Sequence, residues 1–264
     1  MRVVVSGASG RMGRELVKHI FRSKEFVLAG ALVSPQSPFI GKDVGLVVGI
    51  GRVGVTFQTD SIDALGSADT LIDFTVPSAT CDLARLSGEL GVIHVTGTTG
   101  FSPDEEAFIA SAAQKTAIIK SGNMSLGLNL VAALVEKAAA ALGDEFDISV
   151  IDFHHRKKVD SPSGAALILG AAAAQGRPLV RENIVCSLPS RSAARQLGQI
   201  EFASLRGGTV VGDHKVVLAG PHERIELSHI AEDRAIFAIG ALRAASWARD
   251  KGPGLYSMRD VLGI

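Results

Sequence analysis

Five residues that are basic or can become so stand in a row near the middle of the chain, His154-His155-Arg156-Lys157-Lys158. Imidazoles titrate near neutral pH, and ammonium groups bind carboxylates or deliver protons. A short loop follows, and Ser163-Gly164 then opens an apolar run typical of a helix. Because a helix start offers unpaired backbone N–H groups to anions, the segment predicts a site for a small substrate that carries carboxylates. The simpler interpretation is a solvated basic turn.

A strand before this run and a helix after it would hold it in place. The segment 146–153 has the alternation of a half-buried strand, and 164–175 is a helix-like run rich in Ala and Leu. After a polar stretch come three more strand candidates, joined by glycine-rich turns: 200–205, 214–218 and 224–230. We expect these strands to form an antiparallel layer, and hence a second, α+β domain that carries a mainly antiparallel sheet.

The start of the chain carries a second pattern that points to chemistry. Residues 2–6 form a β-branched strand, 14–21 is a helical run, and between them lies a glycine turn, Gly7-Ala8-Ser9-Gly10-Arg11-Met12-Gly13. Glycines in this context permit a tight turn, close approach of the backbone to a pyrophosphate, and close helix–strand packing. The spacing GxxGxxG is a variant of the dinucleotide-binding GxGxxG pattern. The alternative is an ordinary turn between a strand and a helix.

The first half of the chain then repeats strand and helix. Strand candidates lie at 26–33, 53–57, 70–75, 92–96 and 117–120, with helices at 79–90, capped by Ser78, and after Pro103. This alternation predicts an α/β fold, a Rossmann-type doubly wound parallel sheet with right-handed crossovers. Ligands of such sheets bind beyond the carboxyl ends of the strands. Three segments fall at such ends and predict a cofactor rim: Phe74-Thr75, Gly97-Thr98-Thr99 and Ser121-Gly122-Asn123-Met124.

The end of the second strand bears on which nicotinamide cofactor is used. In NAD-binding proteins an Asp or Glu at that point holds the ribose diol. This chain has Val33-Ser34 there, and the nearest acid, Asp43, lies well into a loop. Arg11, Ser34 and Lys42 can instead meet a 2′-phosphate. We therefore expect NADPH or NADH as the cofactor, with NADPH preferred.

Length and composition limit the function classes. The 264 residues suffice for one large domain or two ordinary ones. Lys plus Arg and Asp plus Glu both total 27, so no net charge points to nucleic acid or to a membrane surface as a partner. Cys81 and Cys186 have no metal-ligand spacing, which predicts no metal and a reducing compartment. No signal peptide or long uncharged apolar run occurs, so we expect a soluble, cytoplasmic protein.

Seven motifs occur along the chain in one order: GASGRMG at 7–13, FT at 74–75, GTTG at 97–100, NMSLG at 123–127, HHRKKVDSPSG at 154–164, LRGG at 205–208 and GLYSMRDVLG at 254–263. Together they resemble the dihydrodipicolinate reductase family, and the resemblance covers nearly the full chain. The pattern HHRxKxDxPSG is highly specific to that family, whereas many dehydrogenases share the glycine turn.

The resemblance implies reduction of 4-hydroxy-tetrahydrodipicolinate to tetrahydrodipicolinate with NADPH or NADH, in lysine/diaminopimelate biosynthesis. It implies that His154 donates or accepts a proton and that Lys158 donates one. His155 would touch the substrate, while Ser163, Gly164 and Ala165 would hold a carboxylate. The expected cofactor contacts, with Phe74 added from its place at a strand end, are Gly7, Ala8, Ser9, Gly10, Arg11, Met12, Phe74, Gly97, Thr98, Thr99, Ser121, Gly122, Asn123 and Met124.

The resemblance also implies a homotetramer joined through the sheets of the second domain, with the C-terminal helix returning to the first. Helix-like runs at 126–142 and 234–247 mark the two crossings. We therefore predict a dinucleotide-binding domain at 1–125 plus 237–264, and a substrate-binding and tetramerisation domain at 126–236.

The chemistry of these residues agrees with the implied roles. Hydride addition to an electron-poor ring carbon builds negative charge on the conjugated ring nitrogen, which a nearby ammonium or imidazolium stabilises and then protonates. One departure from the family is Ala165, where Thr is usual; a hydroxyl contact is lost, but the backbone N–H can still bind a carboxylate. The stretch 187–199 follows the family poorly.

Two other functions are consistent with parts of the pattern. A semialdehyde or homoserine dehydrogenase-type reductase has the same domain pairing, and a phosphorylating semialdehyde enzyme needs a Cys nucleophile, for which Cys81 near a helix start is the candidate. Full activity of a Cys81→Ser variant would exclude that role. A nicotinamide-binding regulator without catalysis would keep the glycine turn but would not need His154 and Lys158 together. It would bind NADPH and never oxidise it with freshly made substrate.

Overall fold

The computed structural model describes residues 1–177, 184–185, 194–195 and 197–264. The chain forms two compact units, Met1–Ser125 with Arg234–Gly263 (unit 1) and Leu126–Asp233 with Ile264 (unit 2). The chain thus returns to unit 1 at Arg234, slightly before the expected position 237. Cys186 and most of the stretch 187–199 lie outside the described residues.

Unit 1 contains, in chain order, β1 (Arg2–Ser6), α1 (Arg11–Arg22), β2 (Val27–Leu32), α2 (Val44–Val48), β3 (Phe57–Gln58), α3 (Ser61–Leu65), β4 (Thr70–Asp73), α4 (Pro77–Leu90), β5 (Ile93–Thr96), α5 (Pro103–Ala112), β6 (Ala117–Lys120), α8 (Ala235–Ala248), β12 (Gly254–Tyr256) and α9 (Met258–Leu262). Unit 2 contains α6 (Leu126–Leu142), a short 3-10 helix (Gly143–Glu145), β7 (Asp147–His154), α7 (Gly164–Gln175), β8 (Ile184–Val185), β9 (Ile200–Arg206), β10 (Gly212–Ala219) and β11 (Arg224–Ala231).

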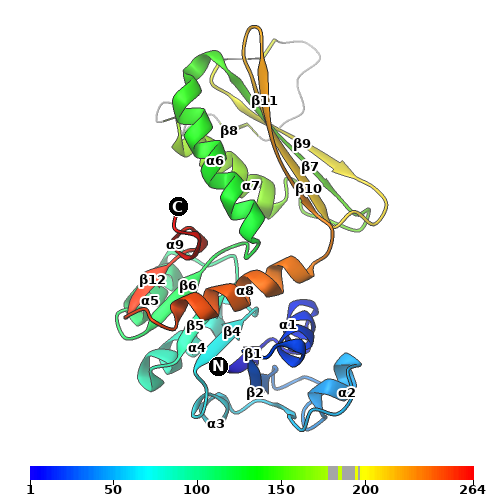
Figure 1. Ribbon diagram of the computed structural model, residues 1–264, viewed down its shortest axis with the longest axis vertical. Coiled ribbons are helices and arrows are strands. Elements are labelled where there is room, and N and C mark those ends of the chain that lie inside the picture. The colour runs from blue at the N-terminus through cyan, green and yellow to red at the C-terminus, as the bar shows by residue number, and fades with distance from the viewer. Residues whose placement is uncertain (178–183, 186–193, 196) are drawn as a thin grey trace. The chain divides into compact units, whose positions relative to one another are not determined.

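Unit 1 is built on a parallel sheet in the order β12-β6-β5-β4-β1-β2-β3 (Figure 1). The chain runs outward from β1 to β3, crosses back to β4 and runs outward again to β6. The change of direction lies between β1 and β4, which is where doubly wound sheets bind ligands. The predicted Rossmann-type sheet is confirmed, and β12 adds an edge strand that the sequence did not predict.

The core of unit 1 lies on both faces of this sheet. Residues 3–5 of β1 are fully buried, as expected for a central strand covered on both sides. The apolar stripe of α1, with Leu16 and Ile20, is buried, and α1 contacts α8. On α4 and α5, Ala84 and Ile109 share a cluster with Ile118 of β6. These layers hold the carboxyl ends of the strands in a fixed row.

Unit 2 is built on a mixed sheet in the order β11-β10-β7-β9-β8 (Figure 1). β10 is antiparallel to both β7 and β11, whereas β9 is parallel to β7 and to β8. The expected second domain with a mainly antiparallel sheet is confirmed. The expectation of one antiparallel layer from the last three strands is wrong for β9, because β7 lies between β9 and β10. The long connection through α7 allows this parallel crossover.

Strand β7 determines what faces the core of unit 2. Its buried and half-buried residues alternate, with Ile148 and Val150 completely buried. Both belong to a core cluster that includes Leu128 of α6 and Leu169 of α7. The next two positions on the same face, Asp152 and His154, are also buried. The core-facing row therefore changes from apolar to polar toward the carboxyl end of β7.

Two local expectations differ from the structure for clear physical reasons. Helix α4 begins at Pro77 with Val76 as its N-cap, so Ser78 is not the cap. Proline at the first helical position has its φ angle already fixed for the helix and starts it earlier. The candidate strand 53–57 shrinks to β3, because Gly51 and Gly54 adopt positive φ angles that interrupt an extended backbone.

One helical stretch in the described part of the chain, Leu126–Glu145, is long and apolar enough by length and composition to cross a membrane. It comprises α6 and the short 3-10 helix. The α6 residues Leu128, Ala132, Val135 and Ala139 are buried in the core of unit 2. Core helices of globular proteins meet the same criterion, so packing accounts for its composition.

Candidate active site

The glycine turn joins β1 to α1 and requires glycine at two positions. Gly7 has a φ of +70°, and a Cβ there would lie 2.5 Å from the carbonyl oxygen of Phe74. A Cβ on Gly13 would overlap the carbonyl oxygen of Gly7 and lie 2.5 Å from Cα of Ala8. Gly10 is the N-cap of α1, and no side chain caps this helix start. The first backbone N–H groups of α1 are therefore left without a side-chain cap, and such groups can bind an anion.

The other predicted cofactor segments leave the sheet in the same row. The last residues of β1, β4, β5 and β6 pair in register: Ser6, Asp73, Thr96 and Lys120. The residues that follow them begin the predicted contact segments. A Cβ on Gly97 would overlap the ring of Phe74, so these two segments touch. The predicted rim therefore lies together along the carboxyl edge of unit 1.

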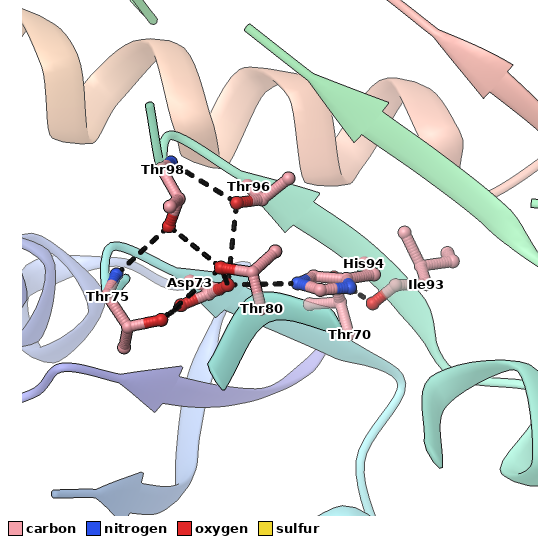
Figure 2. Close-up of polar contacts among 8 residues, drawn as sticks. All are labelled: Thr70, Asp73, Thr75, Thr80, Ile93, His94, Thr96 and Thr98. Carbon is pink, nitrogen blue, oxygen red and sulfur yellow. Dashed lines mark hydrogen bonds and ion pairs between the residues drawn. The ribbon is translucent and has the colours of Figure 1, made fainter. Parts of the chain in front are cut away.

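A buried carboxylate, Asp73, holds the two central segments of this rim together (Figure 2). Its Oδ1 accepts a hydrogen bond from the Thr75 hydroxyl, and its Oδ2 accepts one from the Thr80 hydroxyl, both at 2.6 Å. The Thr98 hydroxyl lies 2.9 Å from the Thr80 hydroxyl and accepts a hydrogen bond from the backbone N–H of Thr75 at 3.1 Å. The network ties the backbone after β4 to the backbone after β5.

The last rim segment, 121–124, is held in place by hydrogen bonds of its own side chains and by helix α8. The Ser121 hydroxyl donates to the carbonyl of Asn123 at 2.7 Å, and Asn123 Oδ1 accepts from the backbone N–H of Ser125 at 2.8 Å. Met124 is buried, and a Cβ on Gly240 of α8 would overlap its carbonyl oxygen. The segment 121–124 is therefore held by a helix from far along the chain.

Basic side chains gather around Phe39, beyond the carboxyl end of β2. The Arg14 guanidinium lies 5.3 Å and the Lys42 ammonium 5.5 Å from the ring centroid, within cation–π range. Ser34 is exposed beside this loop. The Asp43 carboxylate accepts hydrogen bonds from backbone N–H groups at the start of α2 and in the following loop. That acid is therefore engaged in the loop itself.

In unit 2, His154 is the last residue of β7 and is 7% exposed. Its Nδ1 lies 3.1 Å from Oδ2 of Asp152. The ring meets His214 of β10 edge to face, with centroids 5.0 Å apart. The His154 carbonyl accepts a hydrogen bond from the N–H of Gly207 at 2.9 Å. The imidazole is thus held from its own strand and from the strands on both sides.

The basic turn after His154 is folded back on itself. The backbone N–H of Lys158 donates to the carbonyl of His155 at 3.0 Å, and Lys158 Nζ lies 2.9 Å from Oδ2 of Asp160. The Lys158 side chain is 20% exposed, so its ammonium can be reached. Arg206 of β9 donates to the carbonyl of Asp160 at 2.7 Å, which fixes the far end of the turn.

Ser163 is the N-cap of α7, and its buried hydroxyl accepts from the N–H of Ala166 at 3.1 Å. The hydroxyl also lies 3.4 Å from Nε2 of His214. Gly164 is exposed, and a Cβ there would meet nothing within 4 Å. The backbone N–H groups of Gly164 and Ala165 belong to the first turn, where an anion binds. Here Ser163 organises the helix start rather than offering a free side chain.

The surroundings of His154 and His214 lower the pKa of both imidazoles, which favours their neutral forms. Burial lowers the pKa of His154, and the Lys158 ammonium lowers it further, while the Asp152 carboxylate raises it. Burial, with the neighbouring His154 and His229, lowers the pKa of His214 to about 4. A neutral His154 can accept a proton.

We expect stability to fall on acidification between pH 6.5 and 4 because of His214. The unfolded chain binds a proton at the ordinary pKa of 6.5, whereas the folded one binds it only near 4. Stability therefore rises with pH across this window, by on the order of 1–3 kcal/mol. Urea unfolding at pH 7 and pH 5 measures the difference. In a His214→Gln variant the difference in the free energy of unfolding between pH 7 and pH 5 should be smaller, whereas the exposed His222→Gln control should keep the full difference. The same difference in both variants would contradict this assignment.

The site holds residues that sequence reasoning did not single out. In unit 1 these are Asp73 and its partners Thr80, His94 and Thr96; in unit 2 they are Asp152, Arg206 and His214. One signal was present: the strand alternation of 146–153 places Asp152 on the same face as His154. Arg206 lies in the LRGG motif, to which the resemblance gave no role.

The Cys81 nucleophile of a semialdehyde enzyme finds no support in the described residues. Burial raises the pKa of the Cys81 thiol, and the carboxylates of Glu105, Asp82 and Glu106 raise it further, whereas a nucleophilic cysteine needs a lowered pKa. Among the residues that the structure describes, no group of three or more His, Cys, Asp or Glu side chains is placed to hold a metal ion.

Comparisons with known proteins agree with this arrangement. The family models "Dihydrodipicolinate reductase, N-terminus" and "Dihydrodipicolinate reductase, C-terminus" match residues 1–124 and 127–262. The 4-hydroxy-tetrahydrodipicolinate reductase of Rhodopseudomonas palustris (strain BisB18) is 51% identical, over 100% of this chain and 98% of its own. The enzyme of the same name from Methylocella silvestris is 52% identical, over 100% of this chain and 97% of its own.

Solved structures share the fold. The dipicolinate-bound dihydrodipicolinate reductase from Paenisporosarcina sp. TG-14 superposes with a TM-score of 0.78 at 22% identity, over 97% of both chains. An amine dehydrogenase from Mycobacterium smegmatis gives a TM-score of 0.63 at 13% identity, over 98% of this chain and 95% of that one. With both family domains matched and half of the residues identical to full-length relatives, the chain belongs to the dihydrodipicolinate reductase family.

Proposed function

We propose that the protein reduces 4-hydroxy-tetrahydrodipicolinate to tetrahydrodipicolinate in lysine/diaminopimelate biosynthesis. A bound nicotinamide cofactor supplies the hydride. The glycine turn and the rim at the carboxyl edge of unit 1 bind it, with Gly7, Phe74, Gly97 and Ser121 beginning the four contact segments. The uncapped start of α1 supports pyrophosphate binding there, as does the close backbone packing at Gly7 and Gly13, which leaves no room for a Cβ.

In unit 2 we assign the substrate to the carboxyl end of β7. The backbone N–H groups of Gly164 and Ala165, at the N-terminus of α7, hold one carboxylate, and His155 contacts the substrate. The 4-hydroxyl group leaves the substrate as water, and the conjugated ring that results takes the hydride. Lys158 stabilises the negative charge that develops on the ring nitrogen and protonates it, and His154 donates or accepts a proton beside it. The observation that carries this proposal is that His214 contacts both the His154 ring and the Ser163 hydroxyl at the start of α7, with Lys158 in the turn that joins them.

A coupled assay tests the function directly. A synthase generates fresh substrate, and loss of the reduced nicotinamide is followed with NADPH and with NADH. Consumption of the reduced nicotinamide that depends on the synthase product supports the reductase function. Binding of NADPH without any consumption would favour a nicotinamide-binding regulator without catalysis. Full activity of a Cys81→Ser variant would exclude the semialdehyde enzyme with a Cys81 nucleophile.

We propose NADPH as the preferred cofactor. The support is the exposed Ser34 at the end of β2, together with Arg14 and Lys42 around Phe39. Cations at this place attract a 2′-phosphate, and a carboxylate would repel it. Arg11, at the first position of α1, is exposed and belongs to the same set.

A Ser34→Asp variant should move the preference toward NADH. The new carboxylate accepts hydrogen bonds from the ribose hydroxyls of NADH and repels the extra phosphate of NADPH. We expect the ratio of kcat/KM for NADPH over NADH to fall about tenfold or more, equivalent to about 1.4 kcal/mol. Lys42→Ala should lower the same ratio, whereas Lys24→Ala, an exposed lysine on another loop, should not. NADH used as well as NADPH by the unaltered protein would refute the preference.

We propose a homotetramer joined through the sheets of unit 2. On the face of the sheet away from the core, one row of paired residues crosses β9, β7, β10 and β11. It consists of Leu205, Phe153, Asp213 and Ile230. Leu205 is 53% and Ile230 66% exposed, which is unusual for such a row. A Leu205→Lys variant should dissociate the tetramer in sedimentation experiments, with Leu255→Lys as a control; a tetramer that survives would contradict this interface.

The cytoplasm is the compartment that we propose. Cys81 is a free thiol, which suits a reducing environment.

A further inference from the structure

Asp152 is a buried carboxylate two residues before His154, on the same face of β7 and only 1% exposed. In the described part of the chain, three side chains contact this carboxylate. Its Oδ2 lies 3.1 Å from His154 Nδ1 and 3.1 Å from Arg206 Nη1, and its Oδ1 accepts from the Ser204 hydroxyl at 2.5 Å. A buried acid with this set of donors is a fixed hydrogen-bond acceptor for the imidazole.

We propose that Asp152 is a positioning residue for His154. An ionised carboxylate only accepts hydrogen bonds, so Nδ1 of the neutral imidazole must carry the proton. The lone pair then resides on Nε2, the nitrogen that can take part in proton transfer. Asp152 thus selects the tautomer of His154 and fixes the direction of its reactive nitrogen, as a buried acid does for catalytic histidines in general. This inference rests on the function proposed above for His154.

The surroundings of Nε2 fit this assignment. A Cβ on Gly212 of β10 would lie 3.0 Å from Nε2 of His154, so the absence of a side chain there keeps the space beside this nitrogen open. The edge-to-face contact with His214 limits rotation of the ring. A half-turn about χ2 of His154 would place a ring carbon, instead of Nδ1, next to Asp152. The hydrogen bond between Nδ1 and the Asp152 carboxylate opposes this rotation.

Arg206 gives the LRGG motif a role in the same arrangement. Its guanidinium contacts the Asp152 carboxylate with Nη1 and the carbonyl of Asp160 with Nη2. The neighbouring N–H of Gly207 donates to the carbonyl of His154. Arg206, the last residue of β9, and Gly207, which follows it, therefore hold the Asp152 carboxylate, the His154 backbone and the far end of the turn that carries Lys158.

An Asp152→Asn variant of the full chain tests the proposal. The amide keeps the size of the side chain but can donate to Nδ1, which would favour the Nε2–H tautomer. We expect kcat to fall about 10²-fold, the size of one acid–base contribution, with KM for substrate and the affinity for NADPH little changed. The matched control is Asp147→Asn, an acid at the start of the same strand that pairs with Arg195 instead. The control should keep the kcat of the unaltered protein.

Nitrogen-15 NMR of the His154 ring gives a readout that does not need activity. In the unaltered protein at pH 7.5 the neutral ring should be the Nδ1–H tautomer, and in Asp152→Asn it should shift toward Nε2–H. An Nε2–H ring in the unaltered protein, or unchanged kcat in a folded Asp152→Asn variant, overturns the inference. If the variant does not fold, the tautomer of the unaltered protein decides. If the unaltered protein never consumes NADPH, the proposed function fails, and the tautomer still tests the pairing.

Discussion

Replacing Lys158 with alanine should lower kcat by about 10²-fold or more, in the range of a general-acid contribution. The Lys158 ammonium is reachable, and its only recorded ion-pair partner among the described residues is Asp160, an exposed acid. Removing the ammonium takes away both the charge that stabilises the developing anion and the proton that neutralises it. Steady-state assays with fresh substrate measure the fall, and fluorescence titration should show that NADPH binding is little changed.

Lys157→Ala is the matched control, since Lys157 is exposed and stands next to Lys158 in the same turn. Loss of general positive charge would weaken both variants alike and would appear mainly in KM. Loss of a proton donor would appear in kcat of Lys158→Ala alone. Unaltered turnover in Lys158→Ala would contradict the assigned role.

Gly13→Ala should damage the cofactor cradle, the glycine turn between β1 and α1. The new Cβ would overlap the Gly7 carbonyl oxygen and lie 2.5 Å from Cα of Ala8, and backbone atoms cannot move aside as flexible side chains do. We expect the free energy of unfolding to drop by about 1–3 kcal/mol, although alanine favours a helix over glycine. Displacing the turn also removes backbone donors to the pyrophosphate, so NADPH affinity should fall about tenfold or more.

Gly252→Ala serves as the control, because a Cβ on Gly252 would meet nothing within 4 Å. Urea unfolding and NADPH titration should leave this variant unchanged. A Gly13→Ala protein with normal stability and normal NADPH affinity would show that the turn can rearrange freely, against the packing described above.

The sequence was sufficient for the parts of the fold that local patterns control. The β-branched run at 2–6, the glycine turn and the regular alternation that follows predicted the parallel sheet of unit 1. Strand β12 was missed because three residues, Gly254–Tyr256, are too few for a period to show. The parallel pairing of β9 with β7 was missed because partner choice in a sheet depends on contacts distant in sequence.

The same division holds for the candidate site. Residues in contiguous motifs, such as His154 and Lys158, could be picked out because their spacing within one turn is fixed by the chain. The partners that orient them come from other strands: Arg206 from β9 and His214 from β10. Asp73 was visible in the sequence as the end of a strand candidate. Its hydrogen bond with Thr80, and through Thr80 the contact with Thr98, form only once α4 and β5 are in place.

The order of segments in unit 1 has a consequence for synthesis on the ribosome. Residues 1–125 emerge first, but α8, whose Gly240 packs on Met124, and β12 arrive only after residues 126–233 have been translated. At elongation rates of about 5–20 residues per second this interval is roughly 5–20 s. During it the nascent sheet lacks a covering helix and one edge, so chaperones that shield apolar surface should bind this chain between those two stages.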